Sequence, residues 1–264
     1  MRSSDNSLYT TRLGAGLGLI DETKILLRLW EPGISVKQLH QLALRSGALP
    51  ELTSRRLLNI VAEGFGPRYL VDDANPARFL KCADSALSGA EFKQVLFLHT
   101  CRANLILADF VKEIYWSRYA LGVAELTALD AESFIRRALD DGRMQKRWSD
   151  SVIRRVASYL LGCLSDYGLL KAGRSSRRNL APFQISSNVA FYLAHNLHIS
   201  GIGDNALIEH GDWKLFGLED QEVLDVMKRL ALKGAFIVQA AAGLVKISWK
   251  YGSLAEVCHG ISKN

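Results

Sequence analysis

The sequence lacks the signals that mark secreted, disulfide-rich or zinc-binding proteins. Its four cysteines, among 264 residues, are far apart and show no paired spacing. That pattern excludes a disulfide scaffold or a zinc ribbon and is typical of a reduced compartment. The chain starts with Met1-Arg2-Ser3 and has no N-terminal stretch that is basic, then apolar, then small, so secretion is not expected. We therefore expect a cytoplasmic protein.

Long apolar segments are also missing. The longest stretch without charged residues runs from Asn179 to Gly203 and is long enough to cross a bilayer. It contains Pro182, His195 and Asn196 among other residues that hydrocarbon does not tolerate. Because 48% of the residues are hydrophobic and 23% are charged, the chain can bury a core. We expect a soluble globular protein without membrane contact, built of one large or two small domains.

Motifs for catalysis, cofactors or metals are weak. The glycines of residues 14–18 follow no strand and miss the six-residue dinucleotide spacing, so we expect a flexible lead into the first helix. His195, His198 and His210 have no cysteine near them, which favours ordinary polar or core histidines over metal ligands. No serine has a nucleophile-elbow context. We predict a protein that is not an enzyme, with no catalytic residues, metal, cofactor or small-molecule substrate.

The sequence does contain a series of helix signals. Ser35 and Ser88 each begin a capping box, and Thr53 caps another helix. After Ser88 the chain is apolar nearly all round as far as Tyr119, which predicts one long central helix buried on all sides. Further helices are predicted from Asp130, as cap, to Leu139, from Ser149, as cap, to Tyr167, and from Asp220 to Lys233.

Positive charge is concentrated in about a sixth of the chain. The formal net charge is +6, and residues 136–178 hold eleven basic and four acidic side chains, so this segment accounts for the whole excess. Concentrated charge of one sign is what a polyanion-binding surface requires, because the fields of neighbouring residues add. The alternative is a solvated face whose charge is screened by salt.

The segment from Asp130 to Ser187 has the element order of a winged helix. A helix, a polar turn, a second helix, a basic loop and a short strand follow one another. In such a unit the second helix lies in the DNA major groove and the loop contacts the DNA backbone. One side of the second helix is apolar, and the opposite side consists of Ser151, Arg154, Arg155, Ser158, Gly162 and Ser165. Small residues there let the helix approach a phosphate backbone closely, while the arginines reach it.

We expect the turn, the outer side of this helix and the loop to form one nucleic-acid-binding surface. Its predicted residues are Arg143, Lys146, Arg147, Ser151, Arg154, Arg155, Ser158, Lys171, Arg174, Arg177 and Arg178. The alternative is a core module that only resembles a winged helix. An earlier pair of helices, 35–46 and 53–63, also resembles a helix-turn-helix, and its Arg55 and Arg56 are secondary nucleic-acid candidates. Because cations in a first helical turn oppose the helix dipole, a packing role is favoured for that pair.

Strand signals are few. The apolar runs Phe183-Gln184-Ile185 and Phe236 to Gln239 predict strands, and the second forms a hairpin with Leu244 to Trp249. The fold class is therefore mainly α, a helical bundle with winged-helix elements and one or two short β-hairpins. We expect three segments, packed as one or two domains: an N-terminal helical subdomain with the helix-turn-helix-like pair (1–86), the central helix with the basic winged-helix-like unit (87–187), and C-terminal helices with the hairpin (188–264).

Short segments spread over nearly the whole chain resemble one family. They are Leu8 to Leu13 with Gly16 and Asp21-Glu22-Thr23, Asp109-Phe110-Val111 with Glu113, Lys146-Arg147-Trp148-Ser149 leading to Leu164 to Leu170, Gly234-Ala235-Phe236, and Ile247-Ser248-Trp249. In these segments the chain resembles the BrxA family, small accessory proteins of BREX bacteriophage-defence systems. The resemblance implies a mostly helical, non-catalytic, DNA-binding protein with a fold similar to the antitermination factor NusB and with other BREX subunits as partners. It identifies no DNA-contacting residue, so the candidates above rest on the helical wheel and on charge.

These observations predict an accessory protein that binds double-stranded DNA mainly through phosphate contacts. The outer side of the second helix offers serine and arginine but few of the Asn and Gln side chains that read base edges, so sequence preference should be weak. Two alternatives stay open. The similarity to NusB suggests an RNA-binding, antitermination-like module, and a basic patch also suits a scaffold that docks an acidic protein partner.

Overall fold

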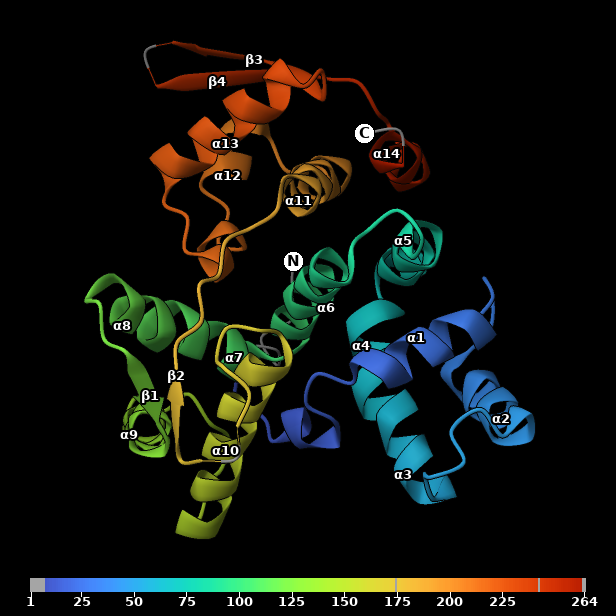
Figure 1. The fold of residues 1–264 in the computed structure, drawn as a ribbon, viewed down its shortest axis with the longest axis vertical. Helices are drawn as coiled ribbons and strands as arrows, with labels where there is room; N and C mark the ends of the chain where they lie inside the picture. The colour runs from blue at the N-terminus through green and yellow to red at the C-terminus, as the bar shows by residue number, and fades with distance from the viewer. Residues whose placement is uncertain (1–7, 174, 242, 263–264) are drawn as a thin grey trace. The chain divides into compact units, whose positions relative to one another are not determined.

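The structure is a computed structural model that describes residues 8–173, 175–241 and 243–262, and it is mainly helical (Figure 1). Among these residues the strands form two antiparallel pairs, β1 with β2 and β3 with β4. The fold class predicted from the sequence, mainly α with short β-hairpins, is confirmed. No helix in the described ranges combines the length and the apolar character needed to cross a bilayer.

The chain divides into two compact units, and each is described here by itself. Unit 1 consists of Met1–Pro76 and Leu96–Phe183, and unit 2 of Ala77–Val95 and Gln184–Asn264. The described elements of unit 1 are, in order, η2 (Arg12–Ala15), α1 (Ile20–Leu29), α2 (Val36–Ser46), α3 (Ser54–Asn59), η3 (Ile60–Phe65), α4 (Gly66–Tyr69), η4 (Asp72–Ala74), the later turns of α6 (Gly89–Ala103), α7 (Leu105–Phe110), η5 (Val111–Tyr115), α8 (Trp116–Ala120), β1 (Glu125–Thr127), α9 (Ala128–Asp140), α10 (Asp150–Asp166) and β2 (Arg177–Asn179).

Unit 2 combines an internal segment with the C-terminal residues. Its described elements are α11 (Ser187–Ile199), α12 (Asp204–Ile208), η6 (Trp213–Phe216), α13 (Asp220–Leu232), β3 (Phe236–Ala241), β4 (Leu244–Trp249) and α14 (Leu254–Ile261), together with most of α5 (Asn75–Ala83) and the first turns of α6 (Gly89–Ala103). The ring of Phe79 on α5 stacks on Tyr192 of α11 with centroids 3.9 Å apart. Such contacts place residues 77–95 with the C-terminal part, so the unit boundaries differ from those of the three expected segments.

A disulfide bond between Cys82 and Cys258 joins α5 to α14 within unit 2. The bonded cysteines are 176 residues apart, and the other two, Cys101 and Cys163, are free and buried. The sequence argument excluded a disulfide scaffold and expected a reduced compartment, and it did not anticipate this single disulfide bond. Spacing along the chain says nothing about two residues that only the folded helices bring together.

Most helix starts follow their local signals. Ser35 begins α2 with a capping box, in which its backbone N–H donates to Gln38 Oε1 (2.8 Å) and its hydroxyl accepts from the Gln38 N–H. Thr53 caps α3, and Ser88 forms the predicted box with Glu91. These predictions are confirmed, because a capping box depends only on residues three positions apart.

The start of α9 differs from the prediction by three residues. The helix begins at Ala128 with Thr127 as its N-cap, and Asp130 is the third helical residue. The Asp130 carboxylate accepts from the Thr127 backbone N–H (2.9 Å), while the Thr127 hydroxyl accepts from the Asp130 N–H (3.2 Å). The sequence predicted that Asp130 caps this helix. In the structure Thr127 is the cap, and Asp130 closes the capping box from inside the first turn.

The long central helix predicted after Ser88 is interrupted. Asn104 has a non-helical backbone (φ −134°, ψ 90°), so α6 ends at Ala103 and α7 starts at Leu105. The Asn104 side chain donates to the Thr100 carbonyl at 2.9 Å, which satisfies an acceptor at the end of α6. A π-helical turn, η5, then separates α7 from α8. Uniform apolar character predicted burial but carried no signal for this break.

The strand predictions are half correct. The predicted C-terminal hairpin is confirmed: β3 and β4 pair from Phe236↔Trp249 to Ala241↔Leu244. Residues 183–185, by contrast, form no strand. The strand lies earlier, at β2, where Arg178 pairs with Leu126 of β1. The apolar side chain of Phe183 packs its ring edge-on against Phe97 instead (5.8 Å between centroids).

The glycine-rich segment 14–18 is packed tightly and is not the flexible lead that the sequence suggested. The Gly18 N–H donates to Asp166 Oδ2 of α10 at 2.9 Å, and the Gly18 carbonyl accepts from the Tyr167 hydroxyl at 3.0 Å. A Cβ atom on Gly18 would lie 2.6 Å from Cβ of Asp166, so only glycine permits this approach. Leu17 likewise lies over Gly162 of α10.

The same segment is held from its other side by a buried arginine. Arg68 of α4 is 2% exposed and donates to the carbonyls of Gly16 (2.5 Å) and Leu17 (3.0 Å). We call residues Gly14 to Gly18 the glycine clasp, because they join α4 to α10 within unit 1. Burial of an arginine is costly unless its donors are satisfied, so these carbonyls are structurally important partners.

Candidate nucleic-acid interface

In unit 1, α9 and α10 form a helix-turn-helix that is followed by a hairpin. Leu170 forms a β-bridge with Leu180, and the Lys171 N–H donates to the Asn179 carbonyl at 2.9 Å. Residues 169–171 and 177–181 are therefore the two arms of the hairpin. The returning arm also pairs with β1 through β2, on its opposite edge, since the Leu180 N–H donates to the carbonyl of Ala124. The hairpin is thus joined to the strand that precedes the two helices.

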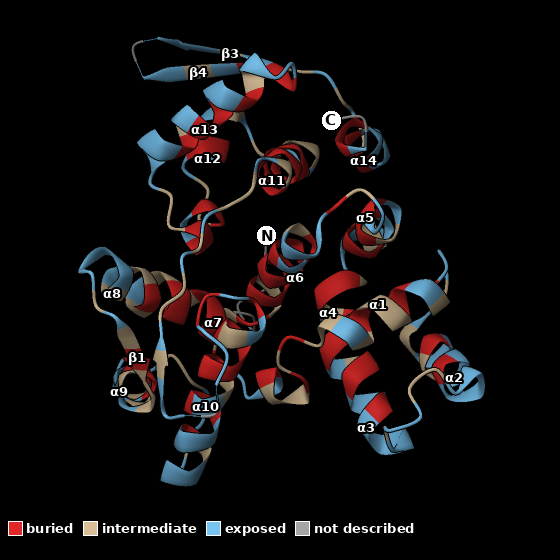
Figure 2. Cartoon of the chain, viewed as in Figure 1, coloured by how far each residue is buried: buried red, intermediate tan, exposed pale blue. Residues whose placement is uncertain are grey.

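The first half of α10 has the predicted polar face. Four side chains at helical spacing are exposed: Ser151, Arg154, Arg155 and Ser158. Ile153, Val156 and Leu160, on the opposite side, are each at most 1% exposed. Figure 2 shows the N-terminal turns of α10, its free end, as largely exposed and its later turns as buried. A stripe with this period places both guanidinium groups on one side of the helix.

The second half of α10 does not continue this face. Gly162 is buried beneath Leu17, and Ser165 is half-buried. Both were predicted to lie on the open side of the helix. The glycine clasp covers Gly162, because the N-terminal segment packs along α10 from Tyr159 to Asp166, and the Ser165 hydroxyl donates to the Lys171 carbonyl at 3.4 Å. The exposed basic face therefore ends near Ser158.

Six of the basic side chains predicted to bind nucleic acid are exposed and form no ion pair with any other described residue. They are Lys146 and Arg147 in the turn, Arg154 and Arg155 on α10, and Lys171 and Arg177 on the hairpin, and together they are called the exposed basic set. The hairpin lies beside α10, since Nη1 of Arg178 donates to the Leu161 carbonyl. In Figure 1 the hairpin and the first turns of α10 extend toward the same edge of the unit.

Arg143, also predicted to bind nucleic acid, forms ion pairs with acidic neighbours. Its Nη1 lies 2.6 Å from Glu113 Oε1, 3.0 Å from the Tyr9 hydroxyl and 3.9 Å from Asp109 Oδ2, and its Nη2 lies 3.4 Å from Asp141. The hydrogen bonds to Glu113 and Tyr9 raise the pKa of Arg143 above its ordinary value. A cation already surrounded by carboxylates has little attraction left for phosphate. Arg143 is therefore excluded from the exposed basic set.

Tyr9 connects this network to the start of the described chain. Its hydroxyl donates to Asp109 Oδ2 at 2.7 Å, and its backbone N–H donates to the Arg143 carbonyl at 2.8 Å. Burial, with the hydrogen bond to Asp109, raises the pKa of Tyr9 above its ordinary value, so the phenol keeps its proton. Tyr9 and Arg143 together fix the turn that leads to Lys146 and Arg147.

Two further predicted residues of the loop have different outcomes. Arg178 is half-buried, with Nη1 on the Leu161 carbonyl at 3.0 Å and a buried Nε that has no hydrogen-bond partner among the described residues. It is directed onto α10 instead of toward solvent, because it occupies a position of β2 opposite Leu126. Arg174 lies outside the described residues.

The secondary candidates lie at the start of α3. Arg55 and Arg56 are exposed in the first turn after the Thr53 cap and form no ion pair within the described ranges. Helix α3 is joined to α2 by a contact of 3.4 Å between His40 Nε2 and the Ser54 carbonyl. These two cations are thus free to bind an anion, but they belong to a different pair of helices from the exposed basic set.

The histidines considered as metal ligands are placed apart from any ligand cluster. Within the described residues, no group of three or more His, Cys, Asp or Glu side chains is arranged to hold a metal ion. His195 is buried against Phe191, Trp249 and Tyr251, and burial lowers its pKa to about 4. His210 lies 3.4 Å from Asp212.

Comparison with known proteins supports the family resemblance that the short sequence segments indicated. The model of the BrxA family matches residues 7–196. A crystal structure of an uncharacterized protein from Magnetospirillum magneticum is similar in fold, with a TM-score of 0.56 and 16% sequence identity over 72% of this chain and 94% of that chain. No curated protein matches the chain. Because the family match extends over well more than half of the sequence, this chain belongs to the BrxA family and is a BREX-associated protein.

Proposed function

We propose that the protein is a non-catalytic, double-stranded DNA-binding accessory component of a cytoplasmic BREX phage-defence system. The observation that carries the proposal is the exposed basic set: six cations without acidic partners in the described chain, carried by one helix-turn-helix and its hairpin. Acidic groups would neutralise a basic face that served only for solubility, as Asp150 does for Arg136 at 2.9 Å.

The arrangement of these elements supports a winged-helix interpretation. Helix α10 is the second helix of the pair, and the hairpin that follows it is joined through β2 to β1. In a winged helix, the second helix enters the major groove and the hairpin contacts the sugar-phosphate backbone. The free end of α10 carries Arg154 and Arg155, and the hairpin carries Lys171 and Arg177, which matches that division.

Phosphates, more than bases, are the expected contacts. The exposed stripe of α10 offers two arginines between Ser151 and Ser158, and no Asn or Gln lies on it. Short serine side chains allow close approach to the backbone, where hydroxyl and guanidinium groups bind phosphate oxygens. Base discrimination depends on bidentate groups aimed at base edges, so we propose weak sequence preference.

A salt-series titration tests the proposal. Binding of labelled duplex DNA is measured by fluorescence anisotropy, with a single strand and a structured RNA of equal length in parallel. With ~6 phosphate contacts, log affinity should fall against log salt with a slope near about −5, and replacing Arg154 and Arg155 by Ala should reduce that slope by about 2.

The matched control removes two exposed cations from unit 2. The variant R229A/K233A has the same net charge as R154A/R155A, and both side chains are exposed on or just after α13. It should keep the wild-type slope. An unchanged slope in R154A/R155A would remove α10 from the interface. Tighter binding of the RNA would favour the antitermination-like alternative, and no affinity for any nucleic acid would favour a scaffold for an acidic protein.

A further inference from the structure

Unit 2 contains a second helix-turn-helix followed by a hairpin, formed by α12, α13, β3 and β4. The hairpin is fixed to α12 by side chains that cap its outer edge. The Val245 N–H donates to Asn205 Oδ1 at 2.7 Å, and the Ile247 N–H donates to Asp204 Oδ2 at 2.9 Å. An edge strand whose N–H groups are covered in this way is held in place and is protected from pairing with another strand.

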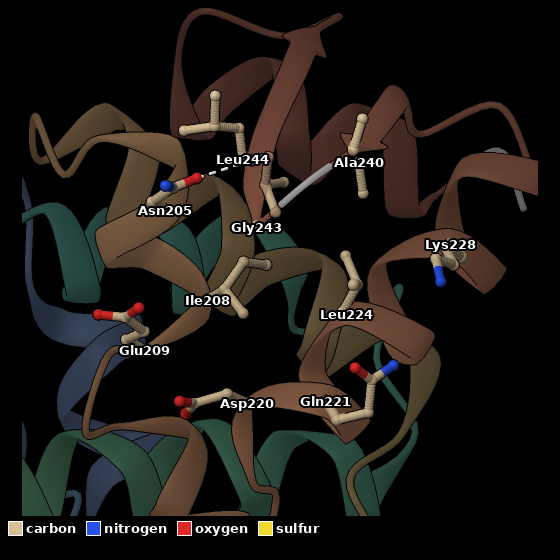
Figure 3. A pocket seen from close by; sticks show the side chains of 12 residues that line it. Asn205, Ile208, Glu209, Asp220, Gln221, Leu224, Lys228, Ala240, Gly243 and Leu244 are labelled. Carbon is tan, nitrogen blue, oxygen red and sulfur yellow. Dashed lines mark hydrogen bonds between the residues drawn. The ribbon is translucent and has the colours of Figure 1, made fainter.

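A cavity of about 460 Å³ lies between the two helices and the tip of the hairpin (Figure 3). Its centre is apolar, formed by Ile208 of α12 and Leu224 of α13, and Leu244 of β4 lines its edge at the hairpin. Leu244 is 70% exposed, although it forms part of this wall. A cavity of this size accommodates a few side chains, and an aliphatic group entering it would cover apolar surface that now faces water.

One end of the cavity is negatively charged. Figure 3 shows the carboxylates of Glu209 and Asp220 at that end, and neither forms an ion pair or a side-chain hydrogen bond with another described residue. Lys228 lines the opposite end, but its ammonium group lies 3.7 Å from Asp225 Oδ1. A ligand in the cavity therefore meets unpaired negative charge at one end, next to the apolar centre.

This charge is opposite to that of α10 at the equivalent place. The first turns of α13 expose Asp220, Glu222 and Asp225, where α10 exposes Arg154 and Arg155. Carboxylates at the start of the second helix repel phosphate and would hinder its insertion into a DNA groove. The same arrangement of elements thus fits different partners in the two units.

We propose that this cavity docks a protein segment in which an aliphatic residue is next to a lysine or arginine. The aliphatic side chain packs against Ile208 and Leu224, at the edge that Leu244 lines, and the cation lies beside Glu209 and Asp220. Charge complementarity selects the partner, because an acidic or nucleic-acid ligand would be repelled at the same end. The inference concerns unit 2 and is independent of the proposed DNA contacts on unit 1.

The test begins with a random-peptide display selected against the full-length protein. The expected result is enrichment of peptides with Leu, Ile or Val beside Lys or Arg. A labelled consensus peptide is then titrated by anisotropy. The E209Q/D220N variant should weaken binding at least tenfold, and L244D, at an exposed position, should do the same. D84N removes an exposed carboxylate of unit 2 outside the cavity lining and is the control, with unchanged affinity expected.

A second peptide separates charge recognition from damage to the protein. Replacing its cation by Gln should weaken binding to the wild type but cause little further loss in E209Q/D220N, since the two groups that interact have then both been removed. The proposal would be overturned if cationic-aliphatic peptides were not enriched. It would also be overturned if the cavity variants bound the consensus peptide as tightly as the wild type. So would a tenfold loss of duplex-DNA affinity in L244D, which would place the cavity in a nucleic-acid surface. The R154A/R155A variant should bind the peptide normally.

Discussion

Nη1 of Arg143 lies 2.6 Å from Oε1 of Glu113, a residue 30 positions earlier in the chain. This ion pair, with the hydrogen bond to Tyr9, anchors the turn between α9 and α10 to the helical segment that carries Asp109 and Glu113. Arg143, which the sequence predicted to contact DNA, is ion-paired with Glu113, and we expect it to position the turn instead. The turn it fixes presents Lys146 and Arg147 to solvent.

Replacing Arg143 by Ala should separate positioning from phosphate binding. Because hydrogen bonds between charged groups are lost, the free energy of unfolding should fall by about 1–3 kcal/mol. Duplex-DNA affinity should also fall, because the turn loses its anchor, while the salt slope stays unchanged. Arg147→Ala is the comparison: its slope should fall by about 0.9 with little loss of stability. A further decrease of the slope when Arg143→Ala is added to the K146A/R147A variant would show that Arg143 contacts phosphate directly.

Substituting Gly18 by Ala should destabilise unit 1. The added Cβ would lie 2.6 Å from Cβ of Asp166, so the glycine clasp must move away from α10 and weaken the Gly18–Asp166 hydrogen bond. We expect a loss of about 1–3 kcal/mol, measured by urea unfolding. Gly89→Ala is the control, since Gly89 begins α6 with open space around it and alanine favours a helix. Equal stability of the two variants would mean that the clasp is loose.

Protonation of His195 should destabilise unit 2 in mild acid. Burial lowers its pKa to about 4, whereas an unfolded histidine has a pKa of about 6.5. The unfolded state therefore binds the proton more readily, so stability is complete above about pH 6.5 and decreases as the pH falls toward 4, by on the order of 3 kcal/mol.

The pH dependence of unfolding checks this prediction. His195→Phe keeps an aromatic ring among Phe191, Trp249 and Tyr251 but cannot be protonated. Its free energy of unfolding should depend less on pH between 6.5 and 4 than that of the wild type. Burial also lowers the pKa of His99, so some dependence of the same sign should remain. Identical pH profiles would assign the effect to other groups.

The disulfide between Cys82 and Cys258 can be tested by counting thiols and by substituting both cysteines. Under denaturing, non-reducing conditions a thiol reagent should detect two thiols, from Cys101 and Cys163, and four after reduction. Because the bond closes a long loop, reduction should lower the free energy of unfolding by about 2–5 kcal/mol. In C82A/C258A, a reductant should have no such effect. Detection of four thiols before reduction would contradict the bond.

Local patterns in the sequence predicted the elements but only part of the site. The capping boxes at Ser35 and Ser88 and the apolar stripe through Ile153 and Val156 depend on residues within one or two helical turns, and all were confirmed. The exposed stripe from Ser151 to Ser158 follows from the same period. The interruption at Asn104, for which the apolar pattern carried no signal, and the position of β2 were missed.

The sequence by itself determined the helical class, most helix starts and the segment in which positive charge is concentrated, because neighbouring residues along the chain decide these properties. Tertiary structure alone decided which cations stay available, as Gly162 lies beneath Leu17 and Arg143 meets Glu113 and Tyr9. It also decided that Cys82 meets Cys258. The physical reason is that burial and charge neutralisation act through space, between atoms whose separation in the chain, 134 residues for Tyr9 and Arg143, leaves no local pattern.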